Sequence, residues 1–249
     1  MTRRNKLLLV FLIVETVIAF LIWRADFTFA GTNILEVYFF DIGQGDAIFM
    51  QLPDGNQILV DGGPSYQILS KLSQVMPFWD RSIDMVILTH PHADHVSGLI
   101  DVLDRYEIGA ILESGVFYDT AEHQAWGEKV NREGGRRVIA RQGQSFKIGQ
   151  LFVMDVLAPL ESFAGKRVSN PHDANIVLKV NYGKEKILLT GDMEKNLELE
   201  LLQEVENIDV DLLKVAHHGS KTSSTQLFLE HVSPELAIIQ VGKGNRYGH

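Results

Sequence analysis

The chain has 249 residues, of which 45% are hydrophobic and 22% are charged, enough for one sizeable globular domain with a short appendage. It contains no cysteine, which excludes disulfides, a thiolate zinc site and a cysteine nucleophile. The formal net charge of −9 provides no bulk attraction to nucleic acid or anionic lipid, so a DNA-binding role requires a local basic patch.

The N-terminal segment carries a long apolar run. Leu7–Trp23 is interrupted near its middle by Glu15, and its length lies at the short end of the range for crossing a hydrocarbon core. Because Arg3, Arg4 and Lys6 precede the run, the positive-inside rule predicts a cytoplasmic N-terminus and an exported domain. We therefore expect residues 1–30 to be a membrane anchor, with residues 31–249 folding as the domain outside.

A cleavable signal peptide is the alternative for this segment. Thr28-Phe29-Ala30 resembles a small-residue cleavage site, but the apolar run is longer than the core of a usual signal peptide. This length favours the uncleaved anchor. The expected location is therefore the cell membrane, single-pass, with an extracytoplasmic domain, and the alternative is secretion after signal cleavage.

The body of the chain begins with three short predicted strands. Residues 34–40, 47–52 and 57–60 are rich in apolar residues and are separated by Gly, Asp and Pro, which predicts an antiparallel meander. The third strand ends in Asp61, which is either a turn residue or a carboxylate that orients a metal-binding histidine. A helix is expected next, over residues 66–75.

Three histidines and an aspartate follow the next predicted strand, residues 83–88. The sequence T-H-P-H-A-D-H places His90, His92, Asp94 and His95 within six residues, and its proline ends the strand. Imidazole nitrogen and carboxylate oxygen are ligands that zinc, manganese and iron accept. We expect His90 and His92 to converge on one ion while Asp94 and His95 face a second. The alternative is a solvated loop that is rich in histidine.

The motif H-x-H-x-D-H after a strand resembles the signature of the metallo-β-lactamase superfamily. The resemblance implies an α/β (α+β) fold, a four-layer αββα sandwich with two mixed sheets and a dimetal site at one edge. It also implies that Asp61 supports a ligand rather than binding metal. The expected cofactors are two divalent transition-metal ions, zinc first and manganese or iron as alternatives, because nitrogen and oxygen ligands suit these metals.

The remainder of the chain alternates predicted helices with strands, which indicates helices layered on sheets. Helices are expected over 96–103, 120–133, 193–204 and 224–231, and strands over 110–112, 145–148, 151–156, 176–180, 186–189, 210–216 and 236–241. Residues 159–174 are expected to form a loop. The helix that begins at Val96 is expected to point its N-terminus at an anionic ligand.

Polar residues follow two of these later strands. Asp192 comes after one, and His217 and His218 come after the other. In the superfamily pattern the aspartate bridges both metals and the histidine before the glycine, His218, completes the second site. His217 is then left to contact substrate or to support a ligand. The third ligand of the first metal is open between His172, Asn175 and water.

Further motifs resemble those of the extracytoplasmic hydrolase domain of the ComEC family of competence proteins. They are D-I-G-Q-G-D-A (41–47), L-V-D-G-G (59–63), L-T-G-D-M (189–193), L-K-V-A-H-H-G-S-K-T-S (213–223) and N-R-Y-G-H (245–249), and they span nearly all of residues 34–249. That family also has a polytopic channel region, whereas this chain offers at most one span, so a transport role is not implied. The family continues beyond N-R-Y-G-H, so we expect a C-terminal truncation.

These observations predict a membrane-anchored, extracytoplasmic, dinuclear metal-dependent hydrolase. The resemblance makes a phosphodiesterase or nuclease acting on single-stranded DNA the expected activity, with no obligate protein partner. Asp94 is expected to accept the proton of the attacking water, and Lys221, Tyr247 and His249 are candidates to bind or protonate the departing group. His217 is a further candidate catalytic residue through its expected contact with substrate. The alternatives are hydrolysis of a cell-envelope phosphoester or a β-lactam, and a non-catalytic metal-binding module.

Overall fold

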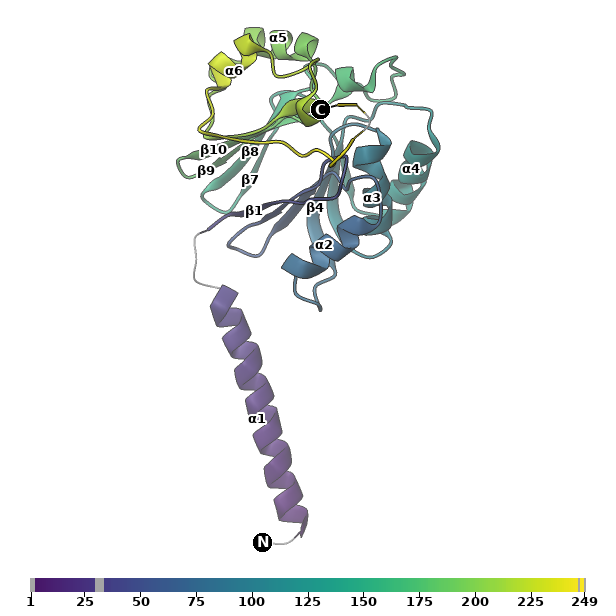
Figure 1. The fold of residues 1–249 in the computed structure, drawn as a ribbon. Coiled ribbons are helices and arrows are strands. Elements are labelled where there is room, and N and C mark those ends of the chain that lie inside the picture. The colour runs from purple at the N-terminus through teal and green to yellow at the C-terminus, as the bar shows by residue number, and fades with distance from the viewer. Residues whose placement is uncertain (1–2, 30–33, 246, 249) are drawn as a thin grey trace.

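The structure of this chain, a computed structural model, describes residues 3–29, 34–245 and 247–248, and for residues 22–29 it describes the backbone alone. Within these residues, two mixed sheets of six strands each pack face to face, with helices on both outer surfaces (Figure 1). The predicted αββα sandwich is confirmed.

The first sheet has the strand order β1-β2-β3-β4-β5-β6. Its strands are β1 (Glu36–Phe39), β2 (Ile48–Gln51), β3 (Gln57–Val60), β4 (Ser82–Leu88), β5 (Glu107–Glu113) and β6 (Arg136–Ile139). β1 to β3 form the predicted antiparallel meander, and β3 to β6 run parallel. β6 is not predicted from the sequence, because this edge strand begins with two exposed arginines and lacks an apolar alternation.

The second sheet has the order β12-β11-β10-β9-β8-β7. Its strands are β7 (Ser145–Ile148), β8 (Phe152–Ala158), β9 (Val177–Tyr182), β10 (Glu185–Leu189), β11 (Leu212–Lys214) and β12 (Leu236–Ile238). β7 to β10 are antiparallel, and β10 to β12 are parallel. β11 and β12 are shorter than predicted.

Helices cover the two outer faces of the sandwich (Figure 1). α2 (Gln67–Val75), α3 (Ala93–Leu103) and α4 (Ala121–Glu133) pack on the first sheet, and α5 (Lys195–Glu204) and α6 (Gln226–Val232) pack on the second. Two short 3₁₀ turns, η1 (Pro171–Ala174) and η2 (Ala216–Gly219), lie next to β9 and β11 in the chain. The predicted 159–174 loop therefore ends in η1.

Alternation of side chains along the strands decides which layer each residue joins. On β3, Leu59 faces the helices and packs in a cluster with Leu99 of α3, whereas Ile58 and Val60 face the second sheet and pack in a cluster with Met154. All five side chains are buried, and each contributes about 1.5–3 kcal/mol to stability on the transfer scale. The apolar pattern thus occupies the faces and leaves polar residues at the strand ends.

The carboxyl ends of strands from both sheets meet at one edge of the sandwich. Asp61 follows β3, His90 follows β4, Asp192 follows β10 and His217 follows β11. Because β3 and β4 are parallel neighbours, as are β10 and β11, each pair brings its C-terminal residues to the same edge. This is the edge at which the sequence predicts a site.

α1 (Arg3–Phe29) precedes the sandwich and stands apart from it in Figure 1. The side chains of residues 3–21 are all exposed. Across the part of the chain that is described, no helix has the length and apolarity needed to cross a membrane. The predicted cleavage site includes Ala30, which lies outside the described residues, as does His249.

Candidate metal centre

The histidine cluster lies between β4 and α3. The helix begins at Ala93 rather than at Val96, so Asp94 and His95 lie in its first turn. His92 is extended, with φ −72° and ψ 149°, and caps the helix, so the chain enters the helix within the cluster. A carboxylate in a first helical turn is favoured by the N–H groups exposed there. The predicted start at Val96 is therefore wrong, and the helix N-terminus itself carries two of the expected ligands.

Three imidazoles form the first group of ligand atoms. Nε2 of His90 lies 3.0 Å from Nδ1 of His92, which lies 3.1 Å from Nε2 of His172. Ligands held about 2.0–2.1 Å from a tetrahedral ion are roughly 3.3 Å apart, so this spacing suits a single cation. His172, on η1, thus occupies the third position that the sequence leaves open.

A carboxylate and two imidazoles form the second group. The ligand atoms of Asp94, His95 and His218 all lie within 4.8 Å of one another. Nε2 of His218 is 3.4 Å from Oδ2 of Asp94. His218 reaches this position from η2, where its φ of 55° is a left-handed conformation that is uncommon outside glycine. These are the residues that the sequence and the superfamily pattern predict for a second metal.

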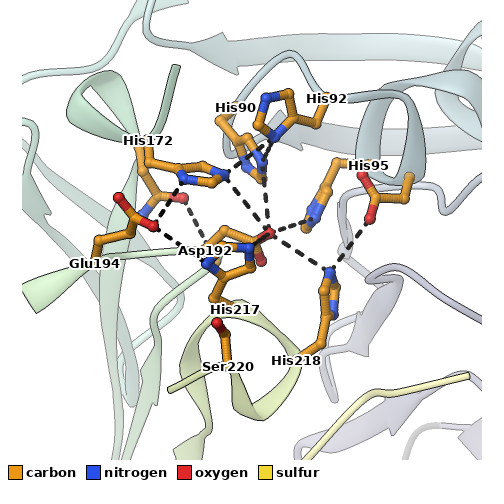
Figure 2. A network of polar contacts seen from close by, with 12 residues as sticks. His90, His92, His95, His172, Asp192, Glu194, His217, His218 and Ser220 are labelled. Carbon is orange, nitrogen blue, oxygen red and sulfur yellow. Dashed lines mark hydrogen bonds and ion pairs between the residues drawn. The ribbon is translucent and has the colours of Figure 1, made fainter. Parts of the chain in front are cut away.

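Asp192 lies between the two groups, as Figure 2 shows. Its Oδ2 atom is 3.7 Å from Nε2 of His90 and 3.9 Å from Nε2 of His172 on one side. On the other side it is 3.4 Å from Nε2 of His95 and 3.5 Å from Nε2 of His218. One oxygen atom therefore faces both groups, which is the position expected of a bridging carboxylate.

Asn175 fixes the backbone next to this aspartate. Its Oδ1 atom accepts a hydrogen bond from the backbone N–H of Asp192 at 3.0 Å, and its Nδ2 donates to the carbonyl of Thr190 at 2.8 Å. A β-carbon on Gly191, whose φ is 51°, would lie 2.3 Å from that Oδ1 atom. The Asn175 side chain is thus engaged with the β10 terminus, and it is His172 whose ring lies beside His92.

The far nitrogens of the second-group imidazoles are held by hydrogen bonds. Nδ1 of His95 lies 2.8 Å from Oδ2 of Asp61, and Nδ1 of His218 lies 2.9 Å from the carbonyl of Gln240. Asp61 is itself fixed by accepting hydrogen bonds from the backbone and hydroxyl of Thr89. Such contacts direct the free Nε2 lone pairs toward a metal. Asp61 lies where it was expected, behind a ligand.

Two rings of the first group, His90 and His92, are uncharged in metal-free protein near neutral pH. Burial and the neighbouring His95 hold the pKa of His90 well below its ordinary value. Burial together with His172 lowers the pKa of His92 to about 4. Both rings therefore present lone pairs to a cation at neutral pH.

The second group has the opposite electrostatics. Burial opposes a charge on His95 and on His218, but neighbouring carboxylates outweigh it. Asp192 raises the pKa of His95 well above its usual value, and hydrogen bonding to Asp46 and Asp94 raises the pKa of His218 to about 9. Burial likewise opposes ionisation of Asp192, yet the His95 charge holds the pKa of Asp192 well below its usual range. In the metal-free protein, the protons on His95 and His218 therefore offset the negative charge of the nearby carboxylates, as a bound cation would.

The residues fit two divalent cations. Nε2 of His95 and Nε2 of His218 are buried, and within the described chain each faces carboxylate oxygens at 3.4–3.5 Å without a hydrogen bond of good geometry. A buried polar atom left this way costs about 1–3 kcal/mol, which coordination to a metal would offset. One ion would be held by His90, His92 and His172, the other by Asp94, His95 and His218, with Asp192 between them. Nitrogen and oxygen donors without thiolate suit zinc, manganese or iron.

The two groups open into a cavity of about 870 Å³. His217 and Tyr247 line it, as the sequence expects of residues that meet a substrate. Lys221 is exposed and is not among the lining residues, so it is not brought to the site. The expected role of His249 falls outside the described residues.

Sequence reasoning missed a buried ion pair behind the site. Lys214 on β11 is fully buried and contacts the carboxylate of Asp46. Its Nζ atom donates to the carbonyl of Gly191 at 2.9 Å and lies 3.9 Å from Oδ1 of Asp192. The available signal was a lysine inside an apolar strand. Glu194 was missed as well, and its Oε1 atom lies 3.6 Å from Nδ1 of both His172 and His217 (Figure 2).

The sequence profile of the metallo-beta-lactamase superfamily matches residues 40–243, most of the chain. The chain belongs to this superfamily. Among curated proteins, it is similar to ComE operon protein 3 of Bacillus subtilis, with 29% identity over 86% of this chain and 29% of that protein. It is also similar to Recombination protein 2 of Haemophilus influenzae, with 31% identity over 82% of this chain and 24% of that protein. The resemblance to ComEC-like competence proteins is thereby confirmed.

The chain spans less than a third of the length of these two relatives. Among solved structures, the metallo-β-lactamase sandwich found here is similar to Igni18, a metallo hydrolase from Ignicoccus hospitalis, with a TM-score of 0.52. That match covers 83% of this chain and 82% of the other at 16% identity, which shows the shared fold alone. The superfamily and the ligand set together make this chain a metal-dependent hydrolase.

Proposed function

We propose that this chain is a dinuclear phosphodiesterase that cleaves single-stranded DNA outside the cell membrane. The observation that carries the proposal is the position of Asp192, whose Oδ2 atom lies 3.4–3.9 Å from ligand nitrogens on both sides. When bound by the two groups of ligands, two divalent cations would supply Lewis acidity for an in-line displacement and would lower the pKa of water toward neutrality. Zinc is our first assignment, and manganese and iron are the alternatives.

Side chains of the cavity accept the proton of the attacking water and contact the departing group. The Asp94 carboxylate lines the cavity, and hydrogen bonding to His218 outweighs burial and keeps the pKa of Asp94 below its usual value. It is therefore ionised at neutral pH and placed to accept a proton from the attacking water. His217 lines the same cavity, with Nδ1 3.6 Å from Glu194. Burial lowers the pKa of His217, so its ring is neutral near neutral pH, and we assign it to contact the departing group, with Glu194 orienting the ring.

Two observations support DNA as the substrate class. The relatives include proteins named for recombination and competence. The cavity of about 870 Å³ lies within the range of small-molecule sites and has room for a nucleotide. With a net charge of −9, the protein should make few phosphate contacts, so its affinity for DNA should depend only weakly on salt.

The N-terminal helix is proposed to anchor the enzyme to the membrane. The apolar side chains of α1 from Leu7 to Leu21 are exposed, several of them by half or more. A largely apolar exposed surface of this kind favours a lipid environment, and the basic residues Arg3, Arg4 and Lys6 that precede it support an N-terminus on the cytoplasmic side. Secretion after signal cleavage is the alternative.

Parallel assays on three substrates test the proposed activity. We expect the zinc-loaded chain to cleave a single-stranded oligonucleotide and bis(4-nitrophenyl) phosphate, but not a chromogenic β-lactam. His90→Ala and Asp192→Ala should each lose at least about 100-fold in kcat, because each removes a ligand. His231→Ala, which alters an exposed histidine on α6, is the matched control.

Each other outcome identifies a different function. Cleavage of the small phosphodiester without cleavage of DNA, even at low salt, would favour a cell-envelope phosphoester as the natural substrate. Cleavage of the β-lactam alone would overturn the phosphodiesterase assignment. Bound metal with no turnover on any of the three substrates would identify a non-catalytic metal-binding module.

A further inference from the structure

Two loops beside the metal centre are joined through their backbones. Residues 115–118 follow β5, and residues 163–167 belong to the segment that leads to η1. The backbone N–H of Phe117 donates to the carbonyl of Lys166 at 2.8 Å, and that of Gly165 donates to the carbonyl of Gly115 at 2.8 Å. We call residues 115–118 and 163–167 the loop pair. The hydrogen bonds between the two loops hold the loop pair together as one surface.

The loop pair presents aromatic rings together with cations. The Phe117 side chain is 40% exposed, and the guanidinium carbon of Arg167 lies 4.3 Å from its ring centroid. The Nζ atom of Lys166 lies 5.3 Å from the ring centroid of Phe163. Large apolar side chains at the surface are unremarkable singly, but aromatic faces combined with Arg and Lys are the elements from which single-stranded nucleic acid sites are built.

The loop pair lies next to the first group of metal ligands. The Tyr118 ring centroid lies 5.6 Å from that of His92, which lines the cavity. The second loop ends at Arg167, and the chain then reaches His172 on η1. Because β4 and β5 are parallel neighbours, the loop after β5 and the histidine cluster after β4 emerge at the same edge. A single strand of DNA bound to the loop pair would therefore lead into the metal centre.

Two acidic residues partly neutralise this surface. Oδ2 of Asp119 lies 3.6 Å from a guanidinium nitrogen of Arg167, and Oε2 of Glu161 lies 3.0 Å from Nζ of Lys166. All four side chains are about half exposed or more. Exposed pairs of this kind contribute only about 0–1 kcal/mol, so a phosphate can replace the carboxylate without a large penalty.

We propose that the loop pair is a binding subsite for single-stranded DNA, in which one base stacks on Phe117 while Arg167 and Lys166 contact backbone phosphates. The inference rests on the proposed function, since it names the surface that guides the substrate of that same site. Duplex DNA hides its base faces, so an exposed aromatic ring selects unpaired strands. The cation–π contact between the Arg167 guanidinium and the Phe117 ring also holds these two side chains together.

Fluorescence anisotropy of a labelled 15-nucleotide oligo-dT on the full chain in EDTA tests the subsite. Phe117→Ala should weaken binding by about 5- to 100-fold, the loss typical of one base–aromatic stack, and Phe117→Trp should restore it. Arg167→Gln should reduce the slope of log affinity against log salt by about 0.7, the loss of one phosphate contact. Asp119→Asn should tighten binding by about 2- to 5-fold, because it releases Arg167.

The controls match these variants in exposure and pairing. Phe78 is an 82% exposed aromatic residue after α2, and Arg132 is an exposed arginine 3.7 Å from Glu128. Phe78→Ala, Arg132→Gln and Glu128→Gln should leave affinity and salt slope at wild-type values. If Phe117→Ala binds oligo-dT as tightly as Phe78→Ala does, or if wild-type protein binds no single strand at low salt, the subsite is wrong.

Hydrolysis by the zinc-loaded protein separates this inference from the proposed function. Absence of wild-type turnover on every phosphodiester, with loss of DNA affinity in Phe117→Ala, would leave the subsite standing and remove the proposed activity. The converse result, cleavage of DNA with a KM that Phe117→Ala does not raise relative to the small phosphodiester, would leave the activity standing and remove the subsite.

Discussion

At the scale of single residues, the Lys214–Asp46 ion pair links the two halves of the sandwich behind the metal centre. Lys214 belongs to β11 of the second sheet, and Asp46 precedes β2 of the first. Burial alone would raise the pKa of Asp46, but the charge of Lys214 outweighs it and keeps that pKa below its usual value. Asp46 also lies 3.3 Å from Nδ1 of His218, so the pair helps position a metal ligand.

Removal of one charge from this pair should be strongly destabilising. Lys214→Met leaves the buried Asp46 carboxylate without its cation, so we expect the free energy of unfolding to fall by about 3–5 kcal/mol. Urea denaturation of the metal-free chain measures this loss. Lys184→Met, at an exposed turn between β9 and β10, is the control and should stay within about 0.5 kcal/mol. Equal stabilities of the two variants would contradict this account of the pair.

The ligand histidines predict a stability maximum near pH 6.5 for the metal-free chain. The folded pKa of His92 is about 4, so as the pH falls below 6.5 the unfolded chain binds a proton that the folded chain does not, and stability falls. The folded pKa of His218 is about 9, so its contribution is complete below pH 6.5 and is lost as the pH rises toward 9. The decrease in the free energy of unfolding should amount to a few kcal/mol on the acid limb, below pH 6.5, and on the alkaline limb, above it.

Urea midpoints measured from pH 4 to 9 in EDTA check this profile. His218→Gln should make the decrease in stability above pH 6.5 shallower and keep the decrease below pH 6.5, and the raised pKa of His95 accounts for the alkaline decrease that remains. Added zinc should also flatten the alkaline limb, since the metal replaces the proton on His218. An alkaline limb in His218→Gln as steep as in the wild type would assign it to other groups.

At the scale of elements, α3 rests directly on the turn that follows β3. The backbone N–H of Gly98 donates to the carbonyl of Gly63 at 2.9 Å, and that of Gly62 donates to the carbonyl of His95 at 2.8 Å. A β-carbon at Gly98 would lie 1.9 Å from the carbonyl oxygen of Gly62, so only glycine permits this approach. The contact holds the first turn of α3, with Asp94, against the turn that carries Asp61.

Gly98→Ala tests whether this approach positions the second group of ligands. The added methyl must push the helix away from the turn, which should cost about 1–3 kcal/mol of stability and weaken binding of the second zinc ion. Gly127→Ala in α4 is the matched control, since a β-carbon there meets nothing within 4 Å and should stabilise the helix by up to about 1 kcal/mol. Calorimetric zinc titration and urea denaturation report both effects, and similar behaviour of the two variants would disprove the positioning role.

Local patterns explain which parts of the fold and site the sequence could predict. Strand periodicity and terminal Gly, Asp and Pro are local signals, so most strands were predicted correctly and the histidine motif was expected at a strand end, where the structure has it. β6 was not, because an edge strand with exposed arginines shows no apolar alternation. The start of α3 was misplaced because its cap is an extended histidine without a side-chain cap hydrogen bond.

At the scale of the whole molecule, the unpredicted features are those made by distant segments. His172 meets His92 across 80 residues, and that distance is closed only when the two sheets pack. The Lys214–Asp46 pair likewise joins opposite halves of the chain. Neither contact falls within a short stretch of sequence. The role of His172 was therefore left open and the ion pair was not predicted, whereas Asp192 and His218 were expected from the superfamily pattern.

The proposed anchoring by α1 makes a topological prediction for the intact protein. Protease added to whole cells should digest the sandwich without lysis, because the helix is proposed to hold it on the outer side of the membrane. Immunodetection of the chain after digestion, with a cytoplasmic protein as the control for lysis, measures this. Protection until lysis would reverse the orientation, and recovery of the domain in the medium would instead support signal cleavage.

Two metal ions are expected to act together at one phosphodiester site. Zinc titration of the metal-free chain, followed by the rate of bis(4-nitrophenyl) phosphate hydrolysis, measures how many ions the activity requires. Because Asp192 faces both groups of ligands, we expect the rate to rise to a plateau at two zinc ions per chain, and Asp192→Ala to stay inactive at any ratio. A plateau at one zinc ion per chain, or no hydrolysis at any ratio, would contradict the account.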